Sequence, residues 1–250
     1  MATLMTRNGP VEHAVVGRDE WLVARRELLE AEKAFFREHD RLKERRRALP
    51  WMQVKKRYEF AGPRGKTTLR RLFGDSRQLL VYHFMFNPEH EAGCPHCSFW
   101  ADHYDGPQWH LAQRDTRFVA ISRAPTDRIR AFKQRMGWRF PWYSSGQSDF
   151  NYDFGASFTP EQIASGQAQY NYAPVPAQQT GMVDREGLSA FYKDETGRVY
   201  LTYATFARGI DLLNSTYNLL DLSAKGRDED PAATQSWVRH HDRYDEAPKG

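Results

Sequence analysis

The most constraining feature of this chain is a strongly apolar segment followed, after a short loop, by two cysteines. Residues 79–86 read LLVYHFMF, a continuous apolar and aromatic run that is typical of a central strand covered on both faces. A loop at 87–93 separates this run from the tetrad CPHC at 94–97. Because the residues after the tetrad look helical, we expect Cys94 to lie at the N-terminus of a helix.

The elements around this motif predict an α/β fold with a central mixed sheet flanked by helices. The other expected elements are a strand at 56–60, a helix at 98–114 that Gly106-Pro107 breaks or kinks, a strand at 117–122, a helix at 126–136, a short strand at 140–143, a β-hairpin formed by 188–193 and 199–203, and a closing helix at 210–222. Alternating strands and helices give right-handed crossovers and a parallel centre to the sheet.

The chain divides into three expected regions. Residues 1–50 form an N-terminal extension, residues 51–223 form the α/β domain with an irregular insertion near 144–186, and residues 224–250 form a polar C-terminal tail. The extension carries a long amphipathic helix at 18–49, with an apolar residue at every seventh position: Trp21, Leu28, Phe35, Leu42 and Leu49. So broad a stripe favours packing on the core of the domain, although the seven-residue period also permits a coiled-coil homodimer.

Cys94 and Cys97 are too close together in sequence for a disulfide between them to link distant segments of the fold. A disulfide scaffold of the kind found in secreted proteins is therefore excluded. At a helix N-terminus, unpaired backbone N–H groups and the helix dipole favour a thiolate. We therefore assign Cys94 as the attacking nucleophile and Cys97, one turn later, as the resolving thiol. Pro95 suits the first helical turn, and the imidazole of His96 lies near enough to lower the pKa of Cys94.

Several longer segments resemble a known family. They are VYHFMFNPEHEAGCPHCSFWADHYDG, VAISRAP, RMGWRFPWYSSGQSDFNYDFGASF and GLSAFYKDETGRVYLTYATFARG, together with the helix that leads into ALPW at 48–51. The chain is similar to the bacterial thioredoxin-like family catalogued as domain of unknown function 899, within the thioredoxin superfamily. This resemblance covers most of the chain and implies a thioredoxin-like fold and a predicted dithiol–disulfide oxidoreductase. It does not imply a particular substrate.

Two departures from thioredoxins affect what the resemblance implies. Thioredoxins place a cis-proline just before the strand that faces their cysteine pair, whereas here that strand begins near 187–189 with no proline beside it. The CPHC tetrad is similar to that of periplasmic disulfide oxidases, yet residues 1–20 contain no apolar core of the kind that a signal peptide needs. We therefore expect a cytoplasmic protein, and a reductase, sensor or peroxide-linked role rather than disulfide installation.

Three alternatives to the thiol–disulfide oxidoreductase stay open. A peroxiredoxin-like peroxidase would carry P-x-x-x-T/S-x-x-C, but Pro88 lies six residues before Cys94 rather than seven, and Glu91 occupies the hydroxyl position. A metal site could draw on His90, Cys94, His96, Cys97 and His103. A non-catalytic binding protein would leave the cysteines without a role. We favour no metal and no cofactor, because the second ligand pair of a closed zinc site is missing.

Some residues outside the motif are candidates for a substrate pocket beside Cys94. They are Trp100, Trp142, Asp149 and Tyr152. Core packing is the competing interpretation for the two tryptophans, whereas Asp149 and Tyr152 belong to a polar, aromatic stretch of the insertion. His83 lies within the strand that leads to the motif, and we expect it to be a core histidine whose polar atoms are satisfied.

The charge distribution and the hydropathy of the chain argue against nucleic acid and membrane as partners. Residues 1–78 carry 19 lysines and arginines against 11 acidic residues, which we interpret as the solvated face of the long helix, since no nucleic-acid-binding motif accompanies the charge. No apolar run approaches the ~18 residues that a membrane-spanning helix requires. The expected partner is a disulfide or thiol substrate, either a protein, glutathione or a small molecule, with neither nucleic acid nor membrane involved.

Overall fold

The computed structural model describes residues 1–179 and 181–244. The chain forms two compact units: residues 1–50 with 216–236, and residues 51–215 with the C-terminal residues from 237 onward. The second unit holds the large sheet and both cysteines.

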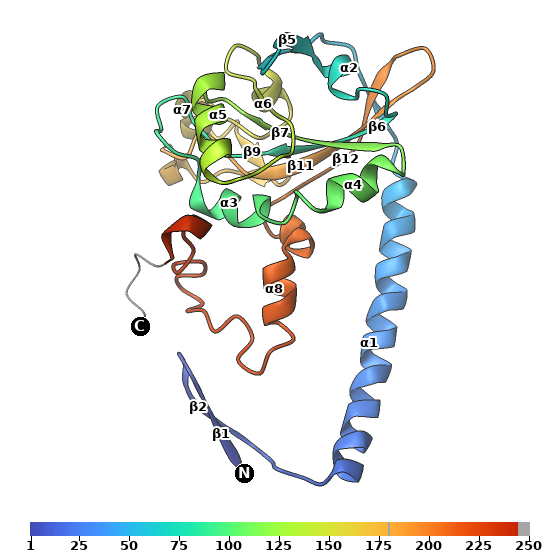
Figure 1. Cartoon of the computed structure of the whole chain (residues 1–250), viewed down its shortest axis with the longest axis vertical. Coiled ribbons are helices and arrows are strands. Elements are labelled where there is room, and N and C mark those ends of the chain that lie inside the picture. Colours follow the sequence, from blue (N-terminus) through green and yellow to red (C-terminus); the bar gives the residue numbers. More distant parts are fainter. Residues whose placement is uncertain (180, 245–250) are drawn as a thin grey trace. The chain divides into compact units, whose positions relative to one another are not determined.

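Eight strands of the second unit form one mixed sheet (Figure 1). They are β3 (Met52–Val54), β4 (Glu59–Gly62), β5 (Gly65–Thr68), β6 (Gln78–His83), β7 (Thr116–Ser122), β8 (Trp142–Ser144), β11 (Gly187–Lys193) and β12 (Val199–Phe206). Their order is β3-β12-β11-β6-β7-β8-β4-β5. Strand β7 is parallel to β6 and to β8, and all the other pairs are antiparallel.

Helices lie between these strands along the chain. They are α2 (Leu69–Leu72), α3 (Pro95–Ala101), α4 (Pro107–Ala112), α5 (Thr126–Arg135), α6 (Phe150–Asp153) and α7 (Pro160–Ala164). Strand β6 lies between its parallel neighbour β7 and its antiparallel neighbour β11, and α3 follows β6 after one loop. A hairpin, β11–β12, continues this side of the sheet, and β3 pairs with β12 at its edge. The thioredoxin-like fold is confirmed.

Some elements differ from the sequence prediction. The expected helix at 98–114 is two helices: α3 ends at Ala101, turns follow at 102–106, and Pro107 begins α4. The closing helix is a 3-10 helix, η2 (Ala207–Leu213), followed by α8 (Ser215–Leu220). The insertion near 144–186 is not irregular throughout: besides α6 and α7 it contains β9 (Gln169–Tyr170), β10 (Ala173–Pro174) and η1 (Ala177–Gln179).

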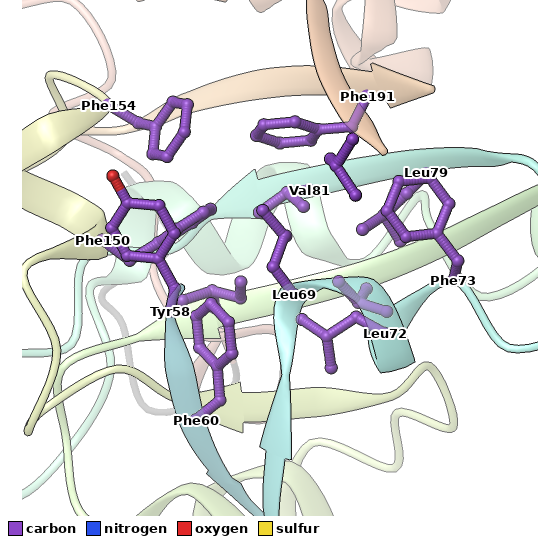
Figure 2. Close-up of a cluster of buried hydrophobic side chains, with 13 residues drawn as sticks. Tyr58, Phe60, Leu69, Leu72, Phe73, Leu79, Val81, Phe150, Phe154 and Phe191 are labelled. Carbon is purple, nitrogen blue, oxygen red and sulfur yellow. The ribbon is translucent and has the colours of Figure 1, made fainter. Parts of the chain in front are cut away.

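Strand β6 is covered on both faces, as its apolar run predicts. Successive side chains of a strand point to opposite faces, so Leu79 and Val81 face one side. Both belong to the cluster of 13 buried side chains in Figure 2, in which Phe150 lies among aromatic rings from several elements. On the other face, the Tyr82 ring packs 4.9 Å from Tyr104, between the sheet and the segment that contains α3.

His83 is the core histidine that the sequence predicts. Its side chain is fully buried, its Nε2 lies 2.8 Å from the hydroxyl of Ser189, and its ring stacks on Phe150. Burial lowers the pKa of His83 to about 3, so the imidazole is neutral in the folded protein. Its Nδ1 has no hydrogen-bond partner among the described residues, so this side chain is only partly satisfied.

We expect His83 to make the protein sensitive to acid. The unfolded chain binds a proton here near pH 6.5, whereas the folded protein does so only near pH 3, so the free energy of unfolding falls as the pH drops through this window. The loss from His83 amounts to about 3 kcal/mol between pH 7 and pH 4. Urea unfolding between pH 7 and pH 4 measures it. His83→Gln, which does not titrate, should show a shallower pH dependence; an equal dependence would contradict the prediction.

The C-terminal segment at 237–244, which is part of the expected polar tail, belongs to the second unit and packs within it. Val238 is buried, and Arg135 forms two hydrogen bonds of 2.8 Å with the Asp242 carboxylate. The His240 Nε2 lies 2.8 Å from the carbonyl of Gly93, in the loop before Cys94. Residues 245–250 of the expected tail lie outside the described residues.

The first unit contains a β-hairpin and the long helix. Strands β1 (Ala2–Thr6) and β2 (Gly9–His13) pair antiparallel, and α1 (Arg18–Arg47) ends shortly before Pro50, as the proline predicts. The packing of α1 on the core and a homodimer stay predictions. None of the helices in the described part of the chain combines the length and the apolar character needed to cross a membrane.

Candidate redox site

The cysteine pair lies where the sequence predicts, at the start of α3. Cys94 is the N-cap residue and Pro95 occupies the first turn. The backbone N–H of Cys94 donates to the carbonyl of Met85, and the Cys94 carbonyl accepts from both the N–H and the hydroxyl of Ser98. Cys94 is partly exposed, whereas Cys97 is fully buried, and both are free thiols. One cysteine can therefore meet a substrate and the other cannot.

The two sulfurs have opposite pKa shifts. A hydrogen bond from the Cys97 thiol, helped by the backbone N–H groups of Cys97 and His96, lowers the pKa of Cys94 to about 7 against the effect of burial. Burial, together with the neighbouring Cys94 sulfur, raises the pKa of Cys97 well above its ordinary value. At neutral pH a large part of Cys94 is therefore thiolate, whereas Cys97 holds its proton. His96 contributes through its backbone N–H, and the effect of its imidazole stays a prediction.

A carboxyl group that the sequence analysis missed lies beside Cys97. Glu186 immediately precedes β11, and Gly187 of that strand pairs with His83, so Glu186 comes to the end of β6 where the loop toward α3 begins. Its carboxyl accepts a hydrogen bond from the Tyr82 hydroxyl, which also lies 3.0 Å from the Cys97 carbonyl. The Cys97 side chain is near enough to influence the pKa of this carboxyl.

The environment keeps Glu186 protonated in neutral solution. Part of the residue reaches the surface, but its carboxyl is enclosed, and burial raises the pKa of Glu186 to about 8. The negative charge of Cys94 acts in the same direction. Glu186 occupies the place before β11 where thioredoxins have their cis-proline. The described residues of this chain contain no cis peptide bond. The signal available in the sequence was an acidic residue directly before a buried strand.

A cleft of about 730 Å³ opens beside Cys94. Its walls come from the loop before α3, from the end of β7 and from the insertion, and they include Arg123, Tyr152 and Asp184. The Arg123 Nε donates to Asp184 Oδ1 at 2.7 Å, and its Nη1 donates to the Tyr152 hydroxyl at 2.5 Å. The Ser157 hydroxyl donates to the same Asp184 oxygen at 2.7 Å. The cleft thus joins an accessible thiol to a fixed ion pair.

Of the four pocket residues predicted from the sequence, only Tyr152 lines this cleft. Trp100 and Trp142 are core residues: their indole N–H groups donate to the Ile210 carbonyl at 3.0 Å and to the Ser122 hydroxyl at 2.9 Å. Asp149 is exposed and bonds to Lys56 at 2.7 Å, outside the cleft walls. Aromatic composition could not separate a core tryptophan from one in a groove.

Two of the alternatives, a metal site and a peroxiredoxin-like motif, can be compared with the residues around Cys94. Among residues 1–179 and 181–244, no group of three or more His, Cys, Asp and Glu residues converges as a metal site would require. The Glu91 side chain, which occupies the hydroxyl position of a peroxiredoxin motif, is 89% exposed.

Comparison with known families agrees with the resemblance in the sequence. Residues 10–244 match the model of a family described as bacterial protein of unknown function (DUF899). The chain belongs to this family. No curated protein matches it. Among solved structures it is similar to peroxiredoxin Q of Xanthomonas campestris, with 13% identity, a TM-score of 0.44, and 67% of this chain and 91% of that chain covered. It is also similar to peroxidoxin BcpB of Mycobacterium tuberculosis, with 16% identity, a TM-score of 0.39, and 66% and 96% covered. Similarities at this level do not bear on its activity.

Proposed function

We propose that this protein is a thiol–disulfide oxidoreductase that uses Cys94 and Cys97 as its redox pair. The observation that carries the proposal is the asymmetry of the pair: a low-pKa thiol beside a cleft and a buried, high-pKa thiol one turn below it. A thiolate attacks disulfides, whereas a thiol does not, so this difference decides which sulfur reacts first.

The reaction balances with the protein dithiol as the two-electron reductant. The Cys94 thiolate attacks one sulfur of a substrate disulfide, forms a mixed disulfide and releases the first substrate thiolate, which takes a proton from solvent. Cys97 then loses its proton and attacks the Cys94 sulfur. This step forms the Cys94–Cys97 disulfide and releases the second substrate thiolate. The substrate gains two electrons and the protein loses two.

Glu186 is the group that takes the proton from Cys97 in the second step. The Glu186 carboxyl and the Cys97 thiol influence each other's pKa, and the chain presents no bulk water to that buried sulfur. When Cys94 becomes part of the mixed disulfide its charge disappears, which removes one of the causes that raise the pKa of Glu186. The carboxylate form therefore becomes more populated when the base is needed.

The reduction potential of the Cys94–Cys97 pair tests this proposal directly. Free thiols are trapped after equilibration of the protein in graded glutathione buffers. We expect a reversible two-electron transition between about −120 and −270 mV, the range of known thiol–disulfide catalysts. Thiols that never pair, or that stay unreactive toward a disulfide at neutral pH, would overturn the proposed function.

A further inference from the structure

One wall of the cleft carries a buried oxygen without a partner. Asp184 is only 7% exposed, and its Oδ1 accepts hydrogen bonds from Arg123 and Ser157. Its other carboxylate oxygen, Oδ2, is buried and has no hydrogen-bond partner among the described residues. Buried carboxylate oxygens are rarely left unpaired, because an unpaired acceptor costs the free energy of its lost hydration. Because Asp184 also lines the cleft, its carboxylate is an acceptor with unused capacity at that wall.

The same wall carries a fixed donor group. The Arg123 guanidinium is held on two sides, by Asp184 at Nε and by Tyr152 at Nη1, and its side chain is 15% exposed. Within the described part of the chain, nothing accepts a hydrogen bond from its Nη2. A planar guanidinium whose position is already fixed binds a carboxylate at a low cost in conformational entropy.

We propose that the cleft binds small disulfides that carry an α-amino acid group, such as cystine. The α-carboxylate bonds to the free edge of Arg123, and the α-ammonium pairs with the Asp184 carboxylate. This inference rests on the proposed function, since the bound disulfide is the one that Cys94 attacks. The donor and the acceptor lie on one wall as an ion pair, so a zwitterion complements both, whereas an anion alone or a cation alone complements one.

The size of the cleft agrees with a small substrate. Sites for small molecules enclose about 300–1,000 Å³, and the 730 Å³ beside Cys94 falls in this range. Cystine reduction follows the scheme above: the Cys94 thiolate and then Cys97 supply two electrons, the protein becomes the Cys94–Cys97 disulfide, and two cysteine molecules leave. No further reductant is needed for one turnover of the reduced protein.

Four disulfides separate the contributions in single-turnover experiments with the reduced full-length protein. They are L-cystine (ammonium and carboxylate), cystamine (ammonium), 3,3′-dithiodipropionate (carboxylate) and bis(2-hydroxyethyl) disulfide (neutral). Each rate is divided by the rate of the same disulfide with dithiothreitol, which removes differences in intrinsic reactivity. We expect cystine to exceed the neutral disulfide by at least about tenfold, the value of one good hydrogen-bonded charge pair. Cystamine and dithiodipropionate should fall between them.

Variants then test which residue binds the ammonium and which binds the carboxylate. For each variant, the rates with two disulfides are compared as a ratio. Asp184→Asn should reduce the ratio of cystine to dithiodipropionate, and Arg123→Gln the ratio of cystine to cystamine. Asp149→Asn, which also changes an aspartate to an amide but lies outside the cleft, should change neither ratio. If a variant fails to fold, the order of the four substrates with the wild-type protein still decides.

Two different failures are distinguishable. If all four disulfides oxidise the protein with equal normalised rates, the amino acid site is wrong while the proposed function stands. If none of the four oxidises Cys94, the proposed function itself fails.

Discussion

Cys94→Ser removes disulfide reduction, with a loss of at least about a thousandfold, whereas Cys97→Ser stops the reaction at the mixed disulfide. A serine hydroxyl is not ionised near neutral pH, so the first variant lacks the nucleophile that a Cys94 thiolate with a pKa of about 7 supplies. The second variant keeps the attacking sulfur and lacks the group that resolves the intermediate. Intact-mass spectrometry after mixing with excess disulfide measures both: no adduct for Cys94→Ser, and one stable adduct for Cys97→Ser.

Thermal unfolding controls for damage to the core in this pair of variants. Cys97 is fully buried, so a serine there places a hydroxyl among apolar groups and lowers stability. The adduct on Cys97→Ser is informative despite this, because only a folded site gives a fast, single modification. Equal adduct formation in both variants would show that the two thiols react alike, and an adduct on Cys94→Ser alone would make Cys97 the reactive thiol; either result would contradict the assignment of Cys94 as the nucleophile.

Glu186→Gln slows the resolving step by about 100-fold, since general base catalysis by a positioned side chain contributes about 10²–10⁴-fold. The inflection near the pKa of Glu186 disappears in this variant, and the rate keeps rising with pH because Cys97 then loses its proton to hydroxide. Only the carboxylate form accepts a proton, and the raised pKa of Glu186, about 8, makes that form scarce at lower pH. The wild-type resolving rate should therefore rise about tenfold per pH unit below the pKa and level off above it. The inflection should lie somewhat below pH 8, because Cys94 carries no charge in the mixed disulfide.

A chromogenic aromatic disulfide separates the two steps, because attack by Cys94 releases one coloured thiolate and resolution by Cys97 releases a second. The slow phase reports the effect of Glu186. Glu195→Gln is a matched control, since that carboxylate is 81% exposed in the turn of the β11–β12 hairpin and bonds only to the surface residue Arg77. It should leave both phases unchanged. A slow phase in Glu186→Gln with the wild-type pH profile would show that another group takes the proton.

Much of the site was predictable because it is local in sequence. The apolar run at 79–86, the loop and the tetrad place Cys94 at a helix N-terminus through nearest-neighbour preferences alone. Pro95 adds to the same signal, since its fixed backbone angle suits the first helical turn. The difference between Cys94 and Cys97 also follows locally, because a residue one turn into a short helix beneath a sheet is buried when the first residue of that helix is not.

The sequence determined by itself the strand, the cysteine pair, the helix that begins there and the α/β order of elements, because each depends on residues within about two turns of one another. Only the tertiary structure decided which distant groups meet the sulfurs. Glu186 reaches Cys97 because β11 pairs with β6 in one register, and a shift of one residue would turn it to the other face. Arg123, Asp184 and Tyr152 meet because β7 ends beside the loop before α3 and the insertion folds back over that edge. Pairing across a sheet depends on the packing of both faces at once, which no local pattern encodes.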